Sequence, residues 1–275
     1  MSIKIIALDL DGTTLSSDRK LGKYTGDAIR DAISTGIEVI ICTGRSINAV
    51  PEQITSIEGL RYVISSNGAS ITDIKAGKKV YRKFLDMEAV QYLMRLSRTD
   101  DLMLEVFVEN QAYMDASLYR DIYENGYPYR NRDYVINTRK PIENILKFTE
   151  EHIDEIENIT VFFDDLDKLE VLKPIIYATP KATVTQSFVN NIEIGGDNTS
   201  KGTALEYMTD FLGRDKSEVM CCGDAPNDVP MLQFASIGIA MANAWEEAKK
   251  AADYITDDND SDGVGKAIRK FALDE

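Results

Sequence analysis

Short apolar runs that end in small polar residues recur along this chain. The first, residues 3–8, is rich in β-branched side chains and is followed by Asp9, Asp11 and Gly12. Because this run is short and apolar on both faces, it predicts a buried strand of a parallel sheet. Three further runs have the same form and cover residues 37–45, 62–69 and 219–228.

The segment between the first two runs has helical spacing. Tyr24, Ala28, Ala32 and Ile33 are spaced as the apolar face of a helix. Strands that alternate with helices predict a parallel sheet. The carboxyl ends of parallel strands share one edge, where open α/β sheets bind their ligands. Six polar side chains are expected at that edge, namely Asp9, Asp11, Thr43, Asn67, Asp224 and Asp228.

Residues 85–189 interrupt this series and have a pattern of their own. The spacing predicts helices over residues 87–96, 118–123, 142–150 and 166–177, the last one starting at Asp164 or Asp165. Strands are predicted over residues 102–108, 111–114, 159–163, 182–186 and 191–194, with a hairpin turn at Glu109-Asn110. This order is typical of an α+β unit with an antiparallel sheet and helices on one face. We therefore expect a core domain of residues 1–84 and 190–275 and an inserted α+β domain of residues 85–189.

The last part of the chain returns to the core pattern. Helices are predicted over residues 200–212, 230–234, 245–252 and 264–271, and strands over residues 236–241 and 253–256. The acidic run at residues 257–262 loosely resembles a calcium loop, but Ile268 stands where such a loop needs glutamate. We interpret this run as a solvated loop before the last helix.

Composition excludes several classes of protein. The length of 275 residues fits two domains, and 44% hydrophobic with 28% charged residues is ordinary for a globular protein. A net charge of −15 makes nucleic acid an unsuitable partner. No apolar stretch is long enough to span a membrane, and the start lacks the features of a signal peptide. Three cysteines, Cys42, Cys221 and Cys222, all lie in predicted strands, so we expect reduced thiols and a cytoplasmic location.

Two carboxylates at the end of a strand, followed by a glycine turn, suggest a metal-assisted reaction on a phosphate. Asp9 and Asp11 are two apart, so their side chains point the same way. One acid can serve as nucleophile and the other as proton carrier. An acidic turn with no chemistry is the alternative, and this motif alone leaves both open. The one histidine, His152, is expected to be exposed, and a single histidine excludes histidine-based phosphatase chemistry.

The motifs together resemble those of haloacid dehalogenase superfamily phosphatases of the Cof-type branch. Four segments match in family order: Asp9-Leu10-Asp11-Gly12-Thr13, Thr43-Gly44-Arg45, Lys201 in Ser200-Lys201-Gly202-Thr203, and Gly223-Asp224-Ala225-Pro226-Asn227-Asp228. The resemblance runs from about residue 3 to about residue 265. It implies an α/β, Rossmann-like parallel-sheet core and a large inserted α+β cap that folds over the active site.

The resemblance also implies roles for the acids. Asp9 would be the nucleophile that forms an aspartyl phosphate, and Asp11 would protonate the leaving alcohol and then activate water. The cofactor would be Mg²⁺, bound by the carboxylates of Asp9 and Asp224 and the backbone carbonyl of Asp11. Asp228 would hold a metal-bound water or orient Lys201 rather than bind the metal directly.

The remaining motif residues would bind the phosphoryl group. Thr43 offers a hydroxyl and a free backbone N–H, Gly44 lets the backbone approach, and Lys201 supplies a positive charge. Asn227 would donate to the phosphate or to metal-bound water, and Asn67 would make a minor contact. For Arg45, a substrate contact and a surface salt bridge remain equally open.

We therefore expect a Mg²⁺-dependent phosphatase of small phosphorylated metabolites, sugar phosphates above all. The alternatives are a phosphomutase of the same superfamily and a catalytically silent metabolite-binding protein. The sequence names neither the substrate nor the oligomeric state. Four aromatic and basic residues of the insert form either a sugar-phosphate contact or a surface loop, and they are Tyr127, Tyr129, Arg130 and Arg132.

Overall fold

The computed structural model describes residues 2–100, 102–127 and 131–274, and these form two compact units. Unit 1 holds the residues up to Gly44, Val50–Tyr81 and the residues from Ser200 onward. Unit 2 holds Arg45–Ala49 and Arg82–Thr199. The expected inserted domain ends at residue 189, whereas the contacts keep the chain in unit 2 up to Thr199.

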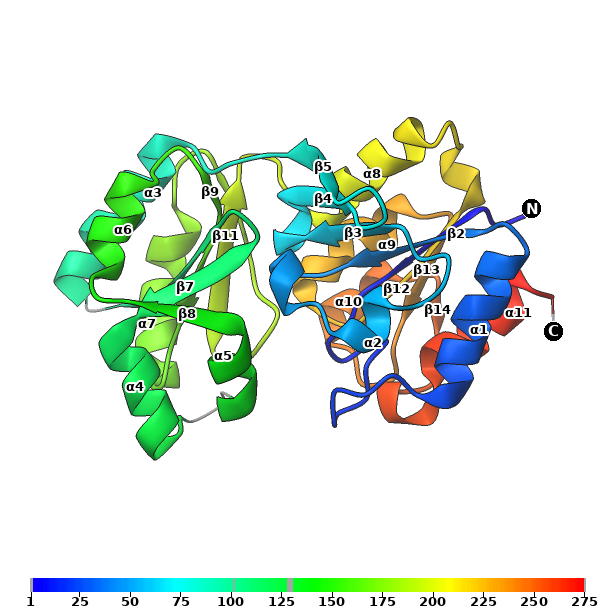
Figure 1. The fold of residues 1–275 in the computed structure, drawn as a ribbon, viewed down its shortest axis with the longest axis horizontal. Coiled ribbons are helices and arrows are strands. Elements are labelled where there is room, and N and C mark those ends of the chain that lie inside the picture. Colours follow the sequence, from blue (N-terminus) through cyan, green and yellow to red (C-terminus); the bar gives the residue numbers. More distant parts are fainter. Residues whose placement is uncertain (1, 101, 128–130, 275) are drawn as a thin grey trace. The chain divides into compact units, whose positions relative to one another are not determined.

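Unit 1 is built on an eight-stranded sheet in the order β14-β13-β12-β1-β2-β3-β4-β5 (Figure 1). Its strands are β1 Ile5–Leu8, β2 Glu38–Cys42, β3 Tyr62–Ser65, β4 Ser70–Asp73, β5 Lys78–Arg82, β12 Val219–Gly223, β13 Ile237–Ala240 and β14 Tyr254–Ile255. Neighbours from β14 to β3 pair in parallel, and β4 pairs antiparallel with β3. The predicted parallel sheet is confirmed, while β4 and β5 were not predicted.

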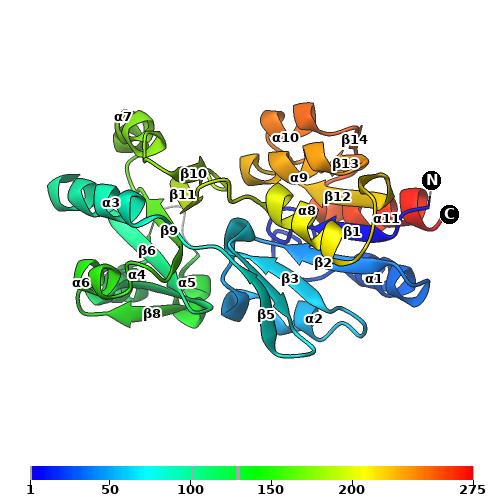
Figure 2. The ribbon, with the colours of Figure 1, turned by 90° about the horizontal axis from the view of Figure 1, so that it is seen from above.

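Helices cover both faces of this sheet (Figure 2). On one face α1 Lys23–Ser34 packs against α11 Gly263–Ala272, and on the other lie α8 Lys201–Phe211, α9 Val229–Phe234 and α10 Glu246–Ala251. Shorter elements are α2 Glu52–Thr55 and the 3₁₀ turns Ile47–Ala49, Ser66–Gly68, Lys216–Glu218, Pro226–Asp228 and Asn259–Ser261. The helix predicted from the spacing of Tyr24, Ala28, Ala32 and Ile33 is α1; Ala28 and Ala32 are buried, whereas Tyr24 at its start is exposed.

Unit 2 is a six-stranded sheet in the order β10-β11-β9-β6-β7-β8. Its strands are β6 Met103–Val108, β7 Gln111–Asp115, β8 Arg139–Ile142, β9 Ile156–Phe162, β10 Ala182–Thr185 and β11 Asn191–Gly196. All neighbours pair antiparallel except β7 and β8, which are parallel. Strand β8 was not predicted from the sequence. It lies at the edge of the sheet, and the two helices that connect it to β7 let the two strands run parallel.

The helices of unit 2 are α3 Met87–Asp100, α4 Ala116–Asn125, α5 Arg132–Thr138, α6 Ile145–Glu151 and α7 Leu166–Tyr177. Helix α7 is capped by the Asp165 carboxylate, which accepts from the N–H groups of Asp167 and Lys168. The β6–β7 turn places Glu109 and Asn110 at positive φ, the geometry of a two-residue hairpin. Alternate residues of β6, β9 and β11 form the core of the unit with α3 and α7.

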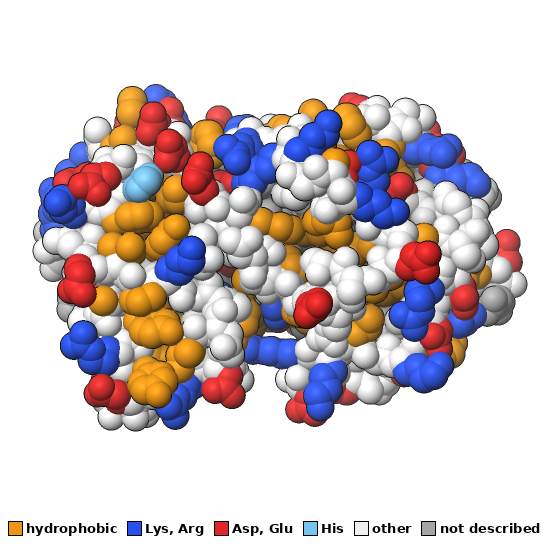
Figure 3. Space-filling model, in the orientation of Figure 1, with side chains coloured by type: hydrophobic (Ala, Val, Ile, Leu, Met, Phe, Trp, Pro, Cys, Tyr) orange, Lys and Arg blue, Asp and Glu red, His pale blue; other side chains and the backbone are white. Residues whose placement is uncertain are grey.

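The surface and the cysteines agree with the composition. Acidic and basic side chains are interspersed over the face shown in Figure 3. Cys42, Cys221 and Cys222 are free thiols and buried. In the part of the chain that the structure describes, no helix has both the length and the apolar character needed to cross a membrane.

Candidate active site

Three carboxylates meet at the carboxyl edge of the unit 1 sheet. Asp9 follows β1, Asp224 follows β12, and Asp228 ends the short turn after Asp224. One oxygen from each lies within 4.8 Å of the others, and all three residues are buried. Strand pairing explains this placement, because β1 and β12 are adjacent and parallel and so end at the same edge.

Lys201 joins two of these carboxylates. Its ammonium donates to Asp9 Oδ1 and to Asp228 Oδ1, each at 2.6 Å, and only 1% of its side chain is exposed. The Ser200 hydroxyl caps α8 by accepting from the N–H of Thr203, which fixes the first turn of the helix. Lys201 is the first residue of that turn. A buried ammonium is stable only when it is paired and hydrogen-bonded, so Lys201 and the two acids hold one another.

Asp228 is engaged through both of its oxygens. Oδ1 accepts from Lys201, and Oδ2 accepts from the backbone N–H groups of Asp224 and Ala225 at 2.9 and 3.0 Å. Gly223 makes room for it, since a Cβ there would lie 2.5 Å from the Asp228 Cβ. The side chain therefore fixes both the turn that carries Asp224 and the direction of Lys201.

The turn after β1 packs directly on Asp224. Thr13 Oγ1 donates to Asp224 Oδ1 at 2.7 Å. Gly12 has φ +77°, and a Cβ at this position would lie 2.5 Å from Asp224 Oδ2. Glycine is needed here for both backbone and space. The sequence analysis assigned no role to Thr13. Its hydroxyl directly after this glycine was the feature that could have indicated a contact with the carboxylates.

The predicted phosphate-binding residues come from the ends of β2, β3 and β12 and from the start of α8. Thr43 follows β2, and the N–H of Asn67, after β3, donates to its carbonyl oxygen at 3.1 Å. The Asn227 amide donates to Asn67 Oδ1 at 3.0 Å. The expectation that the backbone N–H of Thr43 is free was wrong. It donates to the Ile64 carbonyl at 2.9 Å, because parallel pairing continues past β2.

The ionisation of the cluster reflects burial and crowding of negative charge. Burial raises the pKa of the Asp9 carboxyl well above its usual value. The charge of Lys201 lowers this pKa, and the charges of Asp228 and Asp224 raise it again. Burial, and next the charge of Asp228, raise the pKa of Asp224 to about 7. Burial disfavours the charged form of Lys201, but Asp228 and Asp9 hold its pKa above the ordinary value. The cluster is therefore short of positive charge.

Two other candidates from the sequence have defined surroundings. Arg45 is buried, donates to the Ala49 carbonyl at 2.9 Å, and lies over the Tyr134 ring at 4.8 Å. Its side chain therefore lies inside unit 2 rather than on the surface. His152 follows α6, and its ring lies 4.4 Å from the Phe148 ring at an angle of 44°. Its Nδ1 lies 3.0 Å from a Glu155 oxygen, and 34% of its side chain is exposed.

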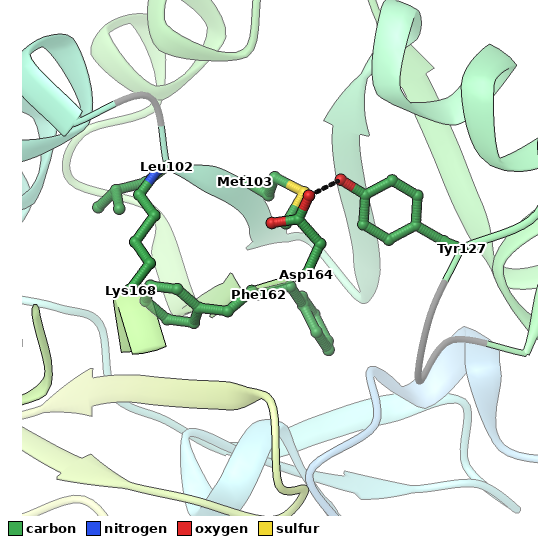
Figure 4. Close-up of a pocket in the computed structure, with 7 residues that line it drawn as sticks. Leu102, Met103, Tyr127, Phe162, Asp164 and Lys168 are labelled. Atoms are coloured by element: carbon green, nitrogen blue, oxygen red, sulfur yellow. Dashed lines mark hydrogen bonds between the residues drawn. The ribbon is translucent and has the colours of Figure 1, made fainter. Parts of the chain in front are cut away.

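Two residues of the predicted aromatic and basic cluster have described surroundings. Tyr127 lies at a cavity of about 160 Å³ in unit 2, where it donates to Asp164 at 3.1 Å (Figure 4). Arg132 begins α5 and lies over the Tyr123 ring at 4.9 Å. Tyr129 and Arg130 lie outside the described residues. The cavity is also lined by Leu102, Met103, Phe162, Phe163 and Lys168.

Comparison with known proteins identifies the family. The model of the haloacid dehalogenase-like hydrolases matches residues 6–268. The chain is 31% identical to 5-amino-6-(5-phospho-D-ribitylamino)uracil phosphatase YcsE of Bacillus subtilis, over 99% of this chain and 97% of that protein. It is 32% identical to the putative phosphatase YxeH of the same organism, over 98% of each.

Solved structures agree. A haloacid dehalogenase-like hydrolase from Bacillus subtilis superimposes with a TM-score of 0.81 at 28% identity, covering 97% of this chain and 99% of that one. A superfamily phosphatase from Bacteroides thetaiotaomicron gives 0.80 at 27% identity, covering 99% and 96%. The chain therefore belongs to the haloacid dehalogenase-like hydrolase family, and within it to the phosphatases that act on phosphorylated substrates.

Proposed function

We propose that this protein is a Mg²⁺-dependent phosphatase that hydrolyses small phosphorylated metabolites through a phosphorylated Asp9. The observation that carries the proposal is the cluster of Asp9, Asp224 and Asp228 around the buried Lys201 ammonium. A carboxylate nucleophile beside a fixed cation at a sheet edge suits the attack on a phosphate monoester.

The charge of the cluster supports a divalent cation. Three charged carboxylates and one ammonium leave two negative charges, and the pKa of Asp224 is raised first by burial and then by the charge of Asp228. Because both oxygens of Asp228 are engaged, Asp9 and Asp224 are the better carboxylate ligands, with the carbonyl oxygen of Asp11 as a third. Oxygen ligands of this kind suit Mg²⁺, which would neutralise charge on the phosphate and polarise it.

The protein's own residues would then carry two steps. Asp9 attacks phosphorus, the bond from phosphorus to the alcohol oxygen breaks, and Asp11 gives that oxygen a proton. Asp11 next takes a proton from water, whose oxygen attacks the phosphorus of the acyl phosphate and returns Asp9 as a carboxylate with release of phosphate. Aspartate suits the second position because one group must both donate and accept a proton.

Four residues would hold the transferring group. Lys201, kept in place by Asp228, faces the phosphoryl oxygens with a full positive charge. The Thr43 hydroxyl, the Gly44 backbone and the Asn227 amide complete the set of donors. Fixed donors of this kind stabilise the charge that develops in the transition state without having to reorganise.

The names of two relatives support a proposal for the substrate class. Two relatives, YcsE and YwtE of Bacillus subtilis, are named as phosphatases of 5-amino-6-(5-phospho-D-ribitylamino)uracil, which carries a phosphorylated sugar alcohol. We infer a phosphorylated sugar or sugar alcohol for this protein too, acting in the cytoplasm, where its buried free thiols stay reduced. A phosphomutase remains the second candidate, and the complete set of acids disfavours a silent site.

Phosphate release should require Mg²⁺ and should fade below neutral pH. We expect EDTA to abolish hydrolysis of a panel of sugar and sugar-alcohol phosphates, and excess Mg²⁺ to restore it.

Asp224, with a pKa near 7 in the fold and about 3.9 unfolded, binds a proton that stabilises the metal-free fold below about pH 4. That contribution is lost as the pH rises through 7.

The same proton competes with Mg²⁺. Apparent Mg²⁺ affinity, measured by thermal shift and by activity, should therefore drop by up to about tenfold per pH unit below pH 7. Full activity in EDTA would remove the metal from the mechanism. Return of phosphate to a second hydroxyl of the sugar, seen by product analysis, would favour the phosphomutase.

Unit 2 is proposed to act as the cap that sets specificity. Replacing Arg82–Thr199, the main segment of unit 2, by a short linker should leave the Asp9 cluster on its sheet, since every residue of that cluster belongs to unit 1. Hydrolysis of p-nitrophenyl phosphate should survive in part, while the ranking among metabolite phosphates should be lost. A folded core that keeps the full-length ranking would place specificity in unit 1.

A further inference from the structure

The acidic run at residues 257–262, which the proposed reaction does not use, binds the loop that follows the catalytic strand. We name residues 257–262 the tail loop and residues 12–21 the catalytic loop. The Asp260 carboxylate accepts from the backbone N–H and the hydroxyl of Ser17 at 2.8 and 2.7 Å. The Asn259 amide donates to the Leu15 carbonyl at 2.9 Å.

Asn243 joins the two loops from a third direction. Its amide nitrogen donates to the Gly12 carbonyl at 2.8 Å, and its amide oxygen accepts from the backbone N–H of Asn259 at 3.1 Å. Asn243 lies in the turn after β13, and two residues later the N–H of Trp245 donates to the Asp224 carbonyl at 2.8 Å. One short turn therefore contacts the backbone on both sides of the carboxylate cluster.

The catalytic loop has little regular structure to hold it. Between Gly12 and Leu21 the structure has only isolated bridges, which pair Leu15 with Asp11 and with Leu21. Yet this loop begins with the two residues that contact Asp224. The Gly12 backbone packs closely against its carboxylate, and the Thr13 hydroxyl donates a hydrogen bond to it. A shift of the loop would therefore move Asp224 and the adjoining Asp11.

We propose that Asn243, Asn259 and Asp260 are positioning residues for the phosphatase reaction. They act through Gly12, Leu15 and Ser17 and keep Asp11 and Asp224 in the geometry that the reaction needs. The inference rests on the proposed function of the cluster. Displacing a reacting group by about 1 Å can cost on the order of a hundredfold in rate, so these exposed or half-buried side chains matter more for turnover than for stability.

A matched pair of carboxylates tests the proposal. Asp215 accepts from the N–H and the hydroxyl of Ser217 at 2.9 and 2.6 Å, and like Asp260 it is exposed. Asp260→Ala should lower kcat about tenfold with KM nearly unchanged, because the phosphate donors are untouched. Asp215→Ala removes the same two bonds elsewhere and should leave kcat as in the wild type, while both variants lose a similar, small amount of thermal stability.

Asn243 gives a second test. Asn243→Asp keeps an acceptor for the Asn259 N–H but loses the donor to Gly12, so it should lower kcat as Asn243→Ala does. Hydrogen exchange of the amides of residues 12–17 should speed up in Asp260→Ala and in both Asn243 variants, but not in Asp215→Ala.

The outcomes separate the two proposals. Unchanged exchange in residues 12–17, or faster exchange with wild-type kcat, would overturn the positioning role. Faster exchange with lower kcat supports it. Retained activity in Asp9→Asn would instead refute the proposed covalent mechanism, whatever the loop does.

Discussion

Asp9→Asn should reduce turnover by at least about a thousandfold while the protein stays folded. The amide has nearly the same shape but is a far poorer nucleophile, and it takes one negative charge from the metal site. Steady-state phosphate release with saturating Mg²⁺ measures this loss. Burial raises the pKa of Asp9, so the charged carboxylate destabilises the metal-free fold. Its neutral replacement should therefore not lower the melting temperature in EDTA.

Covalent trapping provides the control for this prediction. Rapid acid quenching of the wild type with substrate should show a phosphorylated protein by intact mass, and peptide mapping should place the phosphate on Asp9. Asp9→Asn should show none. If Asp9→Asn kept a tenth of the wild-type activity, covalent catalysis through this residue would be wrong.

Lys201→Met should damage both stability and catalysis. The substitution keeps much of the length of the side chain but leaves Asp9, Asp224 and Asp228 buried without an ammonium. Breaking a buried ion pair from one side costs about 3–5 kcal/mol, and losing a fixed donor to the phosphoryl group costs about a hundredfold or more in rate. The loss of stability, measured by urea unfolding in EDTA, should shrink at acid pH, where the acids become protonated.

Lys23 is a matched control for the energetics. Its ammonium lies 2.6 Å from Asp27, the same length as the bonds of Lys201, but 89% of the side chain is exposed. Lys23→Met should therefore change stability by less than about 1 kcal/mol. Adding Asp228→Asn to Lys201→Met should recover part of the stability and none of the activity, because it removes one uncompensated charge. Equal costs for the two lysines would show that Lys201 is not held as the structure indicates.

The core elements could be predicted because each carries its own signal. The runs that became β1, β2, β3 and β12 are short, apolar on both faces and end in small polar residues. Such strands are buried wherever they lie in a parallel sheet, so their identity depends little on distant contacts. Segment β8, by contrast, contains Arg139, Lys140 and Pro141 and has no such pattern. It is a strand only because β7 offers it an open edge.

The sequence by itself determined the parallel sheet, and it predicted an inserted unit and a set of acids at the strand ends, because these predictions need only local pattern and strand direction. Only the tertiary structure decided how these groups pair. Lys201 is an ordinary helix-start lysine in the sequence, yet it joins Asp9, which is 192 residues away, to Asp228. The register of β2 against β3 ties up the Thr43 N–H, and the tail loop reaches back to Ser17. Such contacts depend on distances across the fold, which no local pattern records.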